Sequence, residues 1–392
     1  MIHKRLVRVI SLLVAALFAL NLTATNAQTA AQVAAILNQN GNLTLVTIDQ
    51  NGSVSTLRQV ESYSAILSPL ANSYAQVLYN QAAVLLEYGY LNGETQRLTI
   101  SSPENLITQP VFDKQGNTLL FTTATFEGAW KLYFLSLNGE VRWLDGKFTF
   151  EQGKEDAATS YGVLLPLPDW DAASSSLLTF RVMPFTESFF LGLFSIDLNA
   201  AAPSANGTPL NMTAVAPRGA LGASLFALPS PDQNFVVEVV VDPENRAEGY
   251  PTDVPYYFPL SGLILHDLNS ASSQRLDVPQ GQGIGASVWA ETSEAFYFTV
   301  GYYRQTTSPT APTLYAHTLG NGTRLVAPLS VSDSEAVAGL AVCGERVYYV
   351  LTGAAELQPP DKLNTFTLGS ASIQTILNSE SSIVLLGCVH SQ

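Results

Sequence analysis

After the N-terminal segment, the hydrophobic positions of this chain fall in short runs rather than in a helical period. Runs rich in Val, Leu, Tyr, Phe and Thr recur along the sequence, and each ends at a turn-forming residue. Such runs are typical of β-strands. No long stretch repeats its apolar positions every three to four residues, as an amphipathic helix would. Many short strands at even spacing predict an all-β closed architecture.

Residues 106–145 give the clearest repeating unit. Strands are predicted at 107–112, 118–123, 131–137 and 141–144. The last two are separated by Asn138-Gly139, a strong hairpin signal because both turn positions need a positive φ. Four antiparallel strands joined by three hairpins predict one blade of a β-propeller.

The same pattern recurs in six full units, at 63–100, 106–145, 158–215, 220–278, 283–328 and 335–377. Two fragments remain: 33–60 with three predicted strands, and 382–389 with one. Three strands plus one complete a seventh blade, which would close the ring and leave no free sheet edge. We therefore expect a single propeller of seven four-stranded blades, with N- and C-terminal strands closing one blade. The alternative is six blades with the N-terminal strands packed as an irregular extra.

Part of this repeat resembles a known family, the TolB-like, WD40-like (PD40) propeller repeat. The resemblance is carried by Pro110-Val111-Phe112-Asp113-Lys114-Gln115-Gly116 with Leu132-Tyr133, and by Ser230-Pro231-Asp232. Gln96-Arg97-Leu98-Thr99 and Gln274-Arg275-Leu276 resemble the closing strand of that repeat. No blade carries the complete motif. The resemblance implies a propeller fold. In that family, extracytoplasmic members often act as protein-interaction platforms, and the same propeller also caps prolyl-oligopeptidase-like enzymes.

The N-terminus reads as a secretory signal peptide. Lys4, Arg5 and Arg8 precede an apolar run at 9–20, and small residues follow at 25–27. We expect residues 1–27 to be the signal peptide and residues 28–392 to be the propeller domain. The apolar run is too short to span a bilayer, so no membrane span is expected in the mature chain. The expected location is extracytoplasmic: periplasmic, cell-surface or secreted.

The charge of the chain restricts its partners. The formal net charge is −14, and it becomes −17 without residues 1–27, which carry three basic side chains and no acidic one. Nucleic acid is therefore not expected as a partner, because phosphate binding needs a basic footprint. With 47% apolar and only 13% charged residues, the chain is expected to fold.

The signals for catalysis and for metal binding are weak. No G-x-S-x-G nucleophile elbow is present, and His266, His317 and His390 are the histidines left after the signal. His266 and His317 fall at similar places in successive blades, where a structural role is favoured over a catalytic or metal-binding one. No cofactor is expected; Asp169-Trp170-Asp171 would permit Ca²⁺ without supporting it. The acidic side chains around 238–248 are expected to form a solvated rim.

Cys343 and Cys388 are the two cysteines of the chain, and each lies at the end of a predicted innermost strand. Export permits oxidation. A disulfide between neighbouring inner strands would help to close the ring. The alternative is two buried thiols too far apart to bridge, since a disulfide needs Cα atoms within about 7 Å.

The best candidate binding surface is one rim of the propeller, where loops between second and third strands of several blades open together. These loops carry aromatic and proline residues, and aromatic rings on stiff loops supply contact area at low entropy cost. The candidate residues are Phe185, Tyr250, Tyr256, Tyr257, Phe258, Tyr302, Tyr303 and Arg304. The alternative is that the rings fold back and cover the blade tops.

The favoured function is a non-catalytic, exported binding or scaffold module for a protein or glycan. A propeller enzyme acting on carbohydrate or peptide, or a structural component of the cell envelope, is the alternative.

Overall fold

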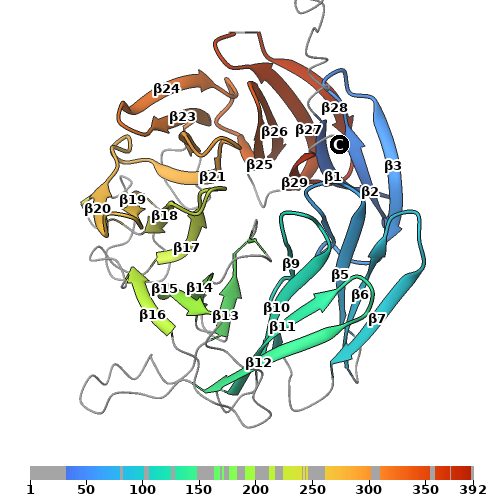
Figure 1. Ribbon diagram of the computed structural model, residues 1–392. Helices are drawn as coiled ribbons and strands as arrows, with labels where there is room; N and C mark the ends of the chain where they lie inside the picture. The colour runs from blue at the N-terminus through green and yellow to red at the C-terminus, as the bar shows by residue number, and fades with distance from the viewer. Residues whose placement is uncertain are drawn as a thin grey trace, which may run out of the picture.

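The computed structural model describes residues 32–79, 83–100, 106–124, 129–147, 163–167, 170–171, 176–182, 190–198, 212–216, 224–240, 242, 244–245, 261–301, 310–353, 358–370 and 372–389. In these ranges the strands form seven sheets, arranged as sectors of a ring (Figure 1). The same ranges contain no helix, and therefore none that could cross a membrane.

We number the sheets as blades in chain order. Blade I contains β29 (Ile383–Val389), β1 (Gln32–Gln39), β2 (Asn42–Ile48) and β3 (Val54–Val60). Blade II contains β4 (Ile66–Leu67), β5 (Ser73–Tyr79), β6 (Val84–Tyr90) and β7 (Thr95–Ile100). Blade III contains β8 (Leu106–Ile107), β9 (Val111–Phe112), β10 (Thr118–Ala124), β11 (Ala129–Ser136) and β12 (Val141–Lys147). Blade IV contains β13 (Val163–Pro166), β14 (Ser176–Val182), β15 (Phe190–Asp197) and β16 (Met212–Ala216).

The other three blades follow the same order. Blade V contains β17 (Ser224–Pro229), β18 (Phe235–Val240), β19 (Gly262–Asp267) and β20 (Ser272–Arg275). Blade VI contains β21 (Gly283–Trp289), β22 (Ala295–Gly301), β23 (Thr313–Thr318) and β24 (Gly322–Pro328). Blade VII contains β25 (Glu335–Cys343), β26 (Arg346–Gly353), β27 (Gln358–Thr367) and β28 (Gln374–Ser379).

Strands from both ends of the chain close the ring. The sheet order of blade I is β29-β1-β2-β3, and the C-terminal β29 pairs antiparallel with β1. The predicted fold, a single all-β propeller of four-stranded blades with both termini in one blade, is confirmed. The seven sheets in the described residues match the larger of the two blade counts that the sequence allowed.

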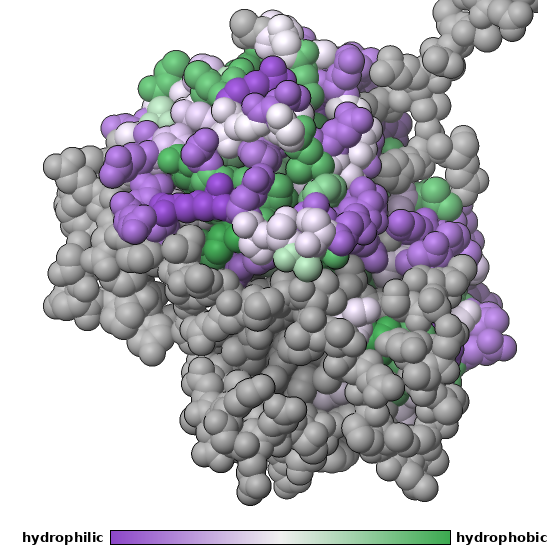
Figure 2. All heavy atoms as spheres, turned by 60° about the vertical axis from the view of Figure 1, so that its left-hand side comes forward, coloured by the Kyte–Doolittle hydropathy of each residue, from purple (hydrophilic) through white to green (hydrophobic). Residues whose placement is uncertain are grey.

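The position of each strand within its blade explains its composition. Middle strands lie between neighbouring blades and are covered on both faces, so they are nearly continuous apolar runs; every residue of β22 is buried. Outermost strands face the solvent, and all four residues of β20 are exposed. In Figure 2, which brings the side with blades V and VI forward, hydrophilic residues cover much of the described surface.

The hydrophobic core consists of clusters between adjacent blades rather than one central mass. One cluster joins blades I and II through Ile36, Leu45 and Tyr74, and another joins blades V and VI. Each blade therefore depends on its neighbours for burial of its apolar faces, because a single four-stranded sheet has no interior of its own.

One tight turn has the backbone conformation that the sequence predicts, and another does not. Asn40 and Gly41 have φ values of 54° and 87°, as a two-residue turn requires. At Asn138-Gly139 only the glycine has a positive φ. There the Asn138 side-chain oxygen accepts a hydrogen bond from the Glu140 backbone N–H at 3.1 Å. The expectation of two positive φ values at this turn was therefore wrong.

The predicted first strand of blade III is divided in the structure. In place of one strand at 107–112, β8 and β9 each pair with β10 and are separated by a short gap. Pro110 lies in the gap, and proline has no N–H to donate to the ladder.

A disulfide joins Cys343 to Cys388, with a Cα–Cα distance of 5.4 Å. Cys343 ends β25 and Cys388 lies near the end of β29, which are the end strands of blades VII and I in the sheet orders. The bond therefore ties the C-terminal strand to the blade that precedes it in the ring.

Candidate ligand-binding groove

The eight rim residues predicted from the sequence lie outside the described residues. These are Phe185, Tyr250, Tyr256, Tyr257, Phe258, Tyr302, Tyr303 and Arg304. The signal-peptide region and Asp169 also lie outside them. The rim therefore stays a prediction, and the candidate site below is built from other residues.

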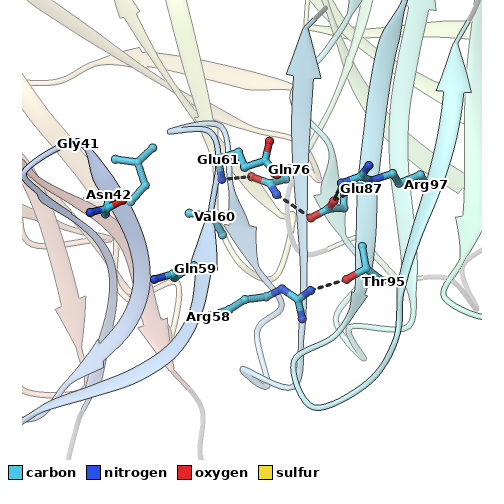
Figure 3. Close-up of a pocket in the computed structure, with 11 residues that line it drawn as sticks. Gly41, Asn42, Arg58, Gln59, Val60, Glu61, Gln76, Glu87, Thr95 and Arg97 are labelled. Atoms are coloured by element: carbon cyan, nitrogen blue, oxygen red, sulfur yellow. Dashed lines mark hydrogen bonds and ion pairs between the residues drawn. The ribbon is translucent and has the colours of Figure 1, made fainter.

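A groove of about 740 Å³ lies between blades I and II. It is lined by side chains of β3, β5, β6 and β7 and by the turn that begins β2 (Figure 3). Its lining residues are Gly41, Asn42, Leu43, Arg58, Gln59, Val60, Glu61, Gln76, Glu87, Thr95 and Arg97. We call it the I/II groove. Leu43 and Val60 also belong to the apolar cluster between the two blades, so a hydrophobic core supports a mainly polar surface.

Glu87 is the centre of a hydrogen-bond network on one side of the groove. It is buried, and its Oε1 accepts from Gln76 Nε2 at 2.7 Å and from the Tyr74 hydroxyl at 3.0 Å. Its Oε2 accepts from Arg97 Nη2 at 2.8 Å and from Arg97 Nε at 3.0 Å. Gln76 Oε1 in turn accepts a hydrogen bond from the Glu61 backbone N–H at 2.8 Å. The network joins the three longer strands of blade II to Glu61, the residue that follows β3 of blade I.

The hydrogen bonds determine the charge state of this network. Burial acts to raise the pKa of Glu87, but the hydrogen bonds from Arg97, Gln76 and Tyr74 outweigh it, so the pKa lies below its ordinary value. The hydrogen bond to Glu87 also raises the pKa of Arg97. Arg97 and Glu87 are therefore an ion pair at neutral pH, and the positive charge of Arg97 is compensated within the protein.

Arg58 is different, because no carboxylate in the described part of the chain pairs with it. Its Nη2 donates to Thr95 Oγ1, and its guanidinium carbon lies 4.3 Å from the centre of the Tyr74 ring. Among the described residues these are its only side-chain hydrogen bond and ring contact, and no carboxylate pairs with it. A guanidinium has five N–H donors. Arg58 is thus held in position on the wall of a groove, and the described residues leave most of its donors unused.

The equivalent positions in other blades show that the fold does not require these polar groups. Glu87 lies opposite Gln76 on β5 and Arg97 on β7, and Gln76 is the fourth residue of its strand. We call such a set of cross-strand partners on the second, third and fourth strands a row. The same row in blade III is Phe121, Tyr133 and Trp143, and in blade VI it is Phe298, Tyr315 and Leu325. Since apolar residues fill this row in blades III and VI, and well-packed apolar groups are often at least as stabilising as buried ion pairs, the polar row of blade II points to a function.

Blade V has a second, smaller pocket of about 390 Å³ near a similar arginine. Arg275 occupies the place of Arg97 in its blade and forms ion pairs with Asp242 and with Glu244, the latter at 2.9 Å. Here the arginine is compensated twice, so it has no charge left for a ligand. Glu238 and Asp242 are buried, so the expected solvated acidic rim was wrong at these two positions. Glu238 lies on the middle strand β18, which the neighbouring blade covers, and Asp242 is paired with Arg275.

The described residues contain one group of side chains close enough together to suggest a metal site, Glu291 with Cys343 and Cys388. Both sulfur atoms belong to the disulfide and are not thiolate ligands. Asp171 is described and Asp169 is not, so the structure does not test the Asp169-Trp170-Asp171 segment as a Ca²⁺ site.

No protein-family model and no curated protein matches the chain. Among solved structures, it resembles an oligogalacturonate lyase in complex with manganese, at a TM-score of 0.51 and 11% identity over 89% of this chain and 86% of that chain. It also resembles the β-propeller domain of the Trilobed protease from Pyrococcus furiosus, at a TM-score of 0.51 and 12% identity over 90% and 95%. A putative TolB from Agrobacterium tumefaciens matches at a TM-score of 0.39 and 13% identity over 74% and 94%.

The first two likenesses establish the propeller fold and nothing finer, because the identities are far below those of close relatives. The fold implied by the TolB-like resemblance is thereby confirmed. The Trilobed protease propeller is described as having an open velcro topology. In this chain, by contrast, β29 pairs with β1 across the junction of the two termini.

Proposed function

We propose that the protein is a binding propeller that works outside the cytoplasm, and that its I/II groove takes a ligand bearing a carboxylate. The observation that carries this proposal is Arg58, a fixed guanidinium with unused donors and no carboxylate partner in the described residues. A planar guanidinium matches a carboxylate with two parallel hydrogen bonds. The location outside the cytoplasm is supported by the signal-like sequence at residues 1–27.

The rest of the lining favours an acidic oligosaccharide over an acidic peptide. Asn42, Gln59 and Thr95 offer amide and hydroxyl groups, and Glu61 adds an acceptor. Such groups suit a ligand with many hydroxyls, whereas a peptide side chain would need an apolar surface to pack on. The volume of about 740 Å³ is in the range of small-molecule sites. The formal net charge, −14 for the full chain and −17 without the three basic residues of 1–27, would repel anions in general, so recognition depends on the local arginine.

Titration calorimetry with short oligogalacturonates tests the proposal, because each sugar unit carries a carboxylate. One fold neighbour is named for that substrate. We expect binding by the wild type and a loss of about 10- to 150-fold in Arg58→Ala, as for a hydrogen bond to a charged group worth about 1.5–3 kcal/mol. Arg324→Ala is the matched control, since Arg324 is an exposed arginine on the outermost strand of blade VI. Neutral oligosaccharides of equal length should not bind.

The predicted aromatic rim is a separate binding hypothesis, and it is supported by the sequence alone. Co-purification of the tagged protein from its native cell envelope should be compared with the variant Tyr256→Ala/Tyr257→Ala/Phe258→Ala. A stoichiometric protein partner lost in the triple variant would support a docking rim. Equal recovery of the partner with both proteins would reject it.

A further inference from the structure

A second constellation outside the I/II groove lies on blade V and is built around His266. His266 and His317 occupy equivalent positions, each opposite the second residue of the second strand in its blade. Each is also paired across the third and fourth strands with a hydroxyl residue, Ser273 for His266 and Thr323 for His317. The similarity that the sequence suggested between the two histidines is confirmed.

In blade V the pairing extends to a buried acid. His266 Nδ1 is 2.8 Å from Ser273 Oγ, and His266 Nε2 is 2.9 Å from Glu238 Oε2. Glu238 is fully buried and His266 is 5% exposed, whereas Ser273 is exposed on the outermost strand β20. Three consecutive strands therefore supply an acid, an imidazole and a hydroxyl in a line that runs from the blade interior to the solvent.

The acid determines how the imidazole is protonated. A carboxylate only accepts hydrogen bonds, so next to an ionised Glu238 the proton lies on Nε2, which donates a hydrogen bond to Glu238 Oε2. In the neutral form of that ring Nδ1 is an acceptor, to which the Ser273 hydroxyl donates. This is the arrangement of an activated nucleophile: a hydroxyl bonded to a base that a third group orients.

Blade VI provides an internal comparison in which the acid is missing. His317 Nδ1 lies 3.1 Å from Thr323 Oγ1, but the position of Glu238 is taken by Phe298, the fourth residue of β22. His317 Nε2 is buried and has no hydrogen-bond partner among the described residues. The cross-strand hydroxyl and histidine thus form without a carboxylate, so the fold does not need Glu238 at this place.

Glu238 is also expected to lower the stability of the folded blade. Its Oε1 is buried without a hydrogen-bond partner among the described residues, and a buried carboxylate carries a desolvation penalty of several kcal/mol. The same position holds Phe121 in blade III and Phe298 in blade VI. An aromatic ring fits this position in two other blades. The presence of Glu238 here therefore points to a role in activating the Ser273 hydroxyl through His266.

We propose that Ser273 is a nucleophile that reacts with carboxylic esters and related acyl donors. Ser273 Oγ attacks the carbonyl carbon while its proton passes to His266 Nδ1. The carbon–oxygen bond of the leaving group then breaks, and the departing alcohol takes that proton. Water hydrolyses the acyl-serine by the same route in reverse, giving a carboxylic acid and restoring the hydroxyl. Glu238 is a positioning residue that holds the tautomer and stabilises the charged imidazole.

Labelling with a fluorophosphonate probe tests the proposal. The phosphorus–oxygen bond to serine forms as the phosphorus–fluorine bond breaks, and the modified residue is located by mass spectrometry. We expect the full-length protein to be labelled at Ser273 at least about 100-fold faster than after heat denaturation, the lower range for general base catalysis. Ser273→Ala should abolish the label. Ser272→Ala is the matched control, since Ser272 is a neighbouring exposed serine on the same strand.

Glu238→Gln separates positioning from structure. The amide is isosteric but can donate to Nε2, which favours the tautomer with a proton on Nδ1 and lowers labelling by at least tenfold. Nitrogen-15 NMR of the histidine rings should show a proton on Nε2 of His266 in the wild type and its loss in the variant. Labelling of the wild type no faster than the denatured protein, or a wild-type proton on Nδ1, would overturn the proposal. Should the variant fail to fold, these two wild-type measurements still decide.

Discussion

The disulfide between Cys343 and Cys388 should contribute measurably to the stability of the closed ring. The two residues are 45 positions apart. Closing a loop of that length lowers the entropy of the unfolded chain by an amount worth about 4 kcal/mol at 25 °C. Reduction of the bond should therefore lower the free energy of unfolding by about 2–5 kcal/mol, a large part of the stability of a typical protein.

Guanidinium unfolding of the oxidised and the reduced wild type measures this contribution, with the four tryptophans as fluorescent probes. The midpoint should move to lower denaturant on reduction. Cys388→Ala should unfold like the reduced wild type and should not respond to reductant. If oxidised and reduced proteins unfold at the same concentration, the pairing of β29 with β1 alone holds the ring closed, and the reasoning fails.

Two further predictions concern single residues. Because hydrogen bonds hold the pKa of Glu87 below its ordinary value of about 4.5, its contribution to stability is full above that pH and is lost as the pH falls through the lower folded-state pKa. Urea unfolding at stepped pH should show Glu87→Gln less stable by about 1–3 kcal/mol at neutral pH and less sensitive to acid below pH 4.5 than the wild type; parallel curves would contradict this. Gly116→Ala should destabilise by more than roughly 1–2 kcal/mol, because Gly116 has a φ of +70° and an added Cβ would lie 2.8 Å from Ser68 Cβ. In thermal unfolding, Gly320→Ala should cost less, since its φ of +78° is similar but nothing lies within 4 Å.

Much of the fold could be predicted because a propeller repeats one local pattern. The turn at Asn40-Gly41 and the three N-terminal strands were readable from the sequence, and the single C-terminal strand was the one that blade I lacked. Ring closure then followed from the avoidance of free sheet edges. The division of β8 from β9 was missed, although Pro110 between them is a sequence signal for a broken ladder.

The I/II groove was not predicted because its residues come from several strands of two blades. Arg97 was noted only as part of a closing-strand motif, and Arg58 belongs to the preceding blade. A signal was present in Glu87, the charged residue of the otherwise mainly apolar strand β6. The expected acidic rim was wrong at Glu238 for a related reason: Glu238 lies in the apolar strand β18, and the neighbouring blade covers a middle strand.

The central claim is that Arg58 makes the I/II groove a site for a carboxylate, and calorimetry with oligogalacturonate tests it most directly. The account predicts that the wild type and Arg324→Ala bind equally. Arg58→Ala should lose about 10- to 150-fold in affinity, and Arg58→Lys should lose part of it because an ammonium lacks the paired donors. Equal affinity of the wild type and Arg58→Ala for the ligand, or no binding by the wild type to any acidic oligosaccharide, would contradict it.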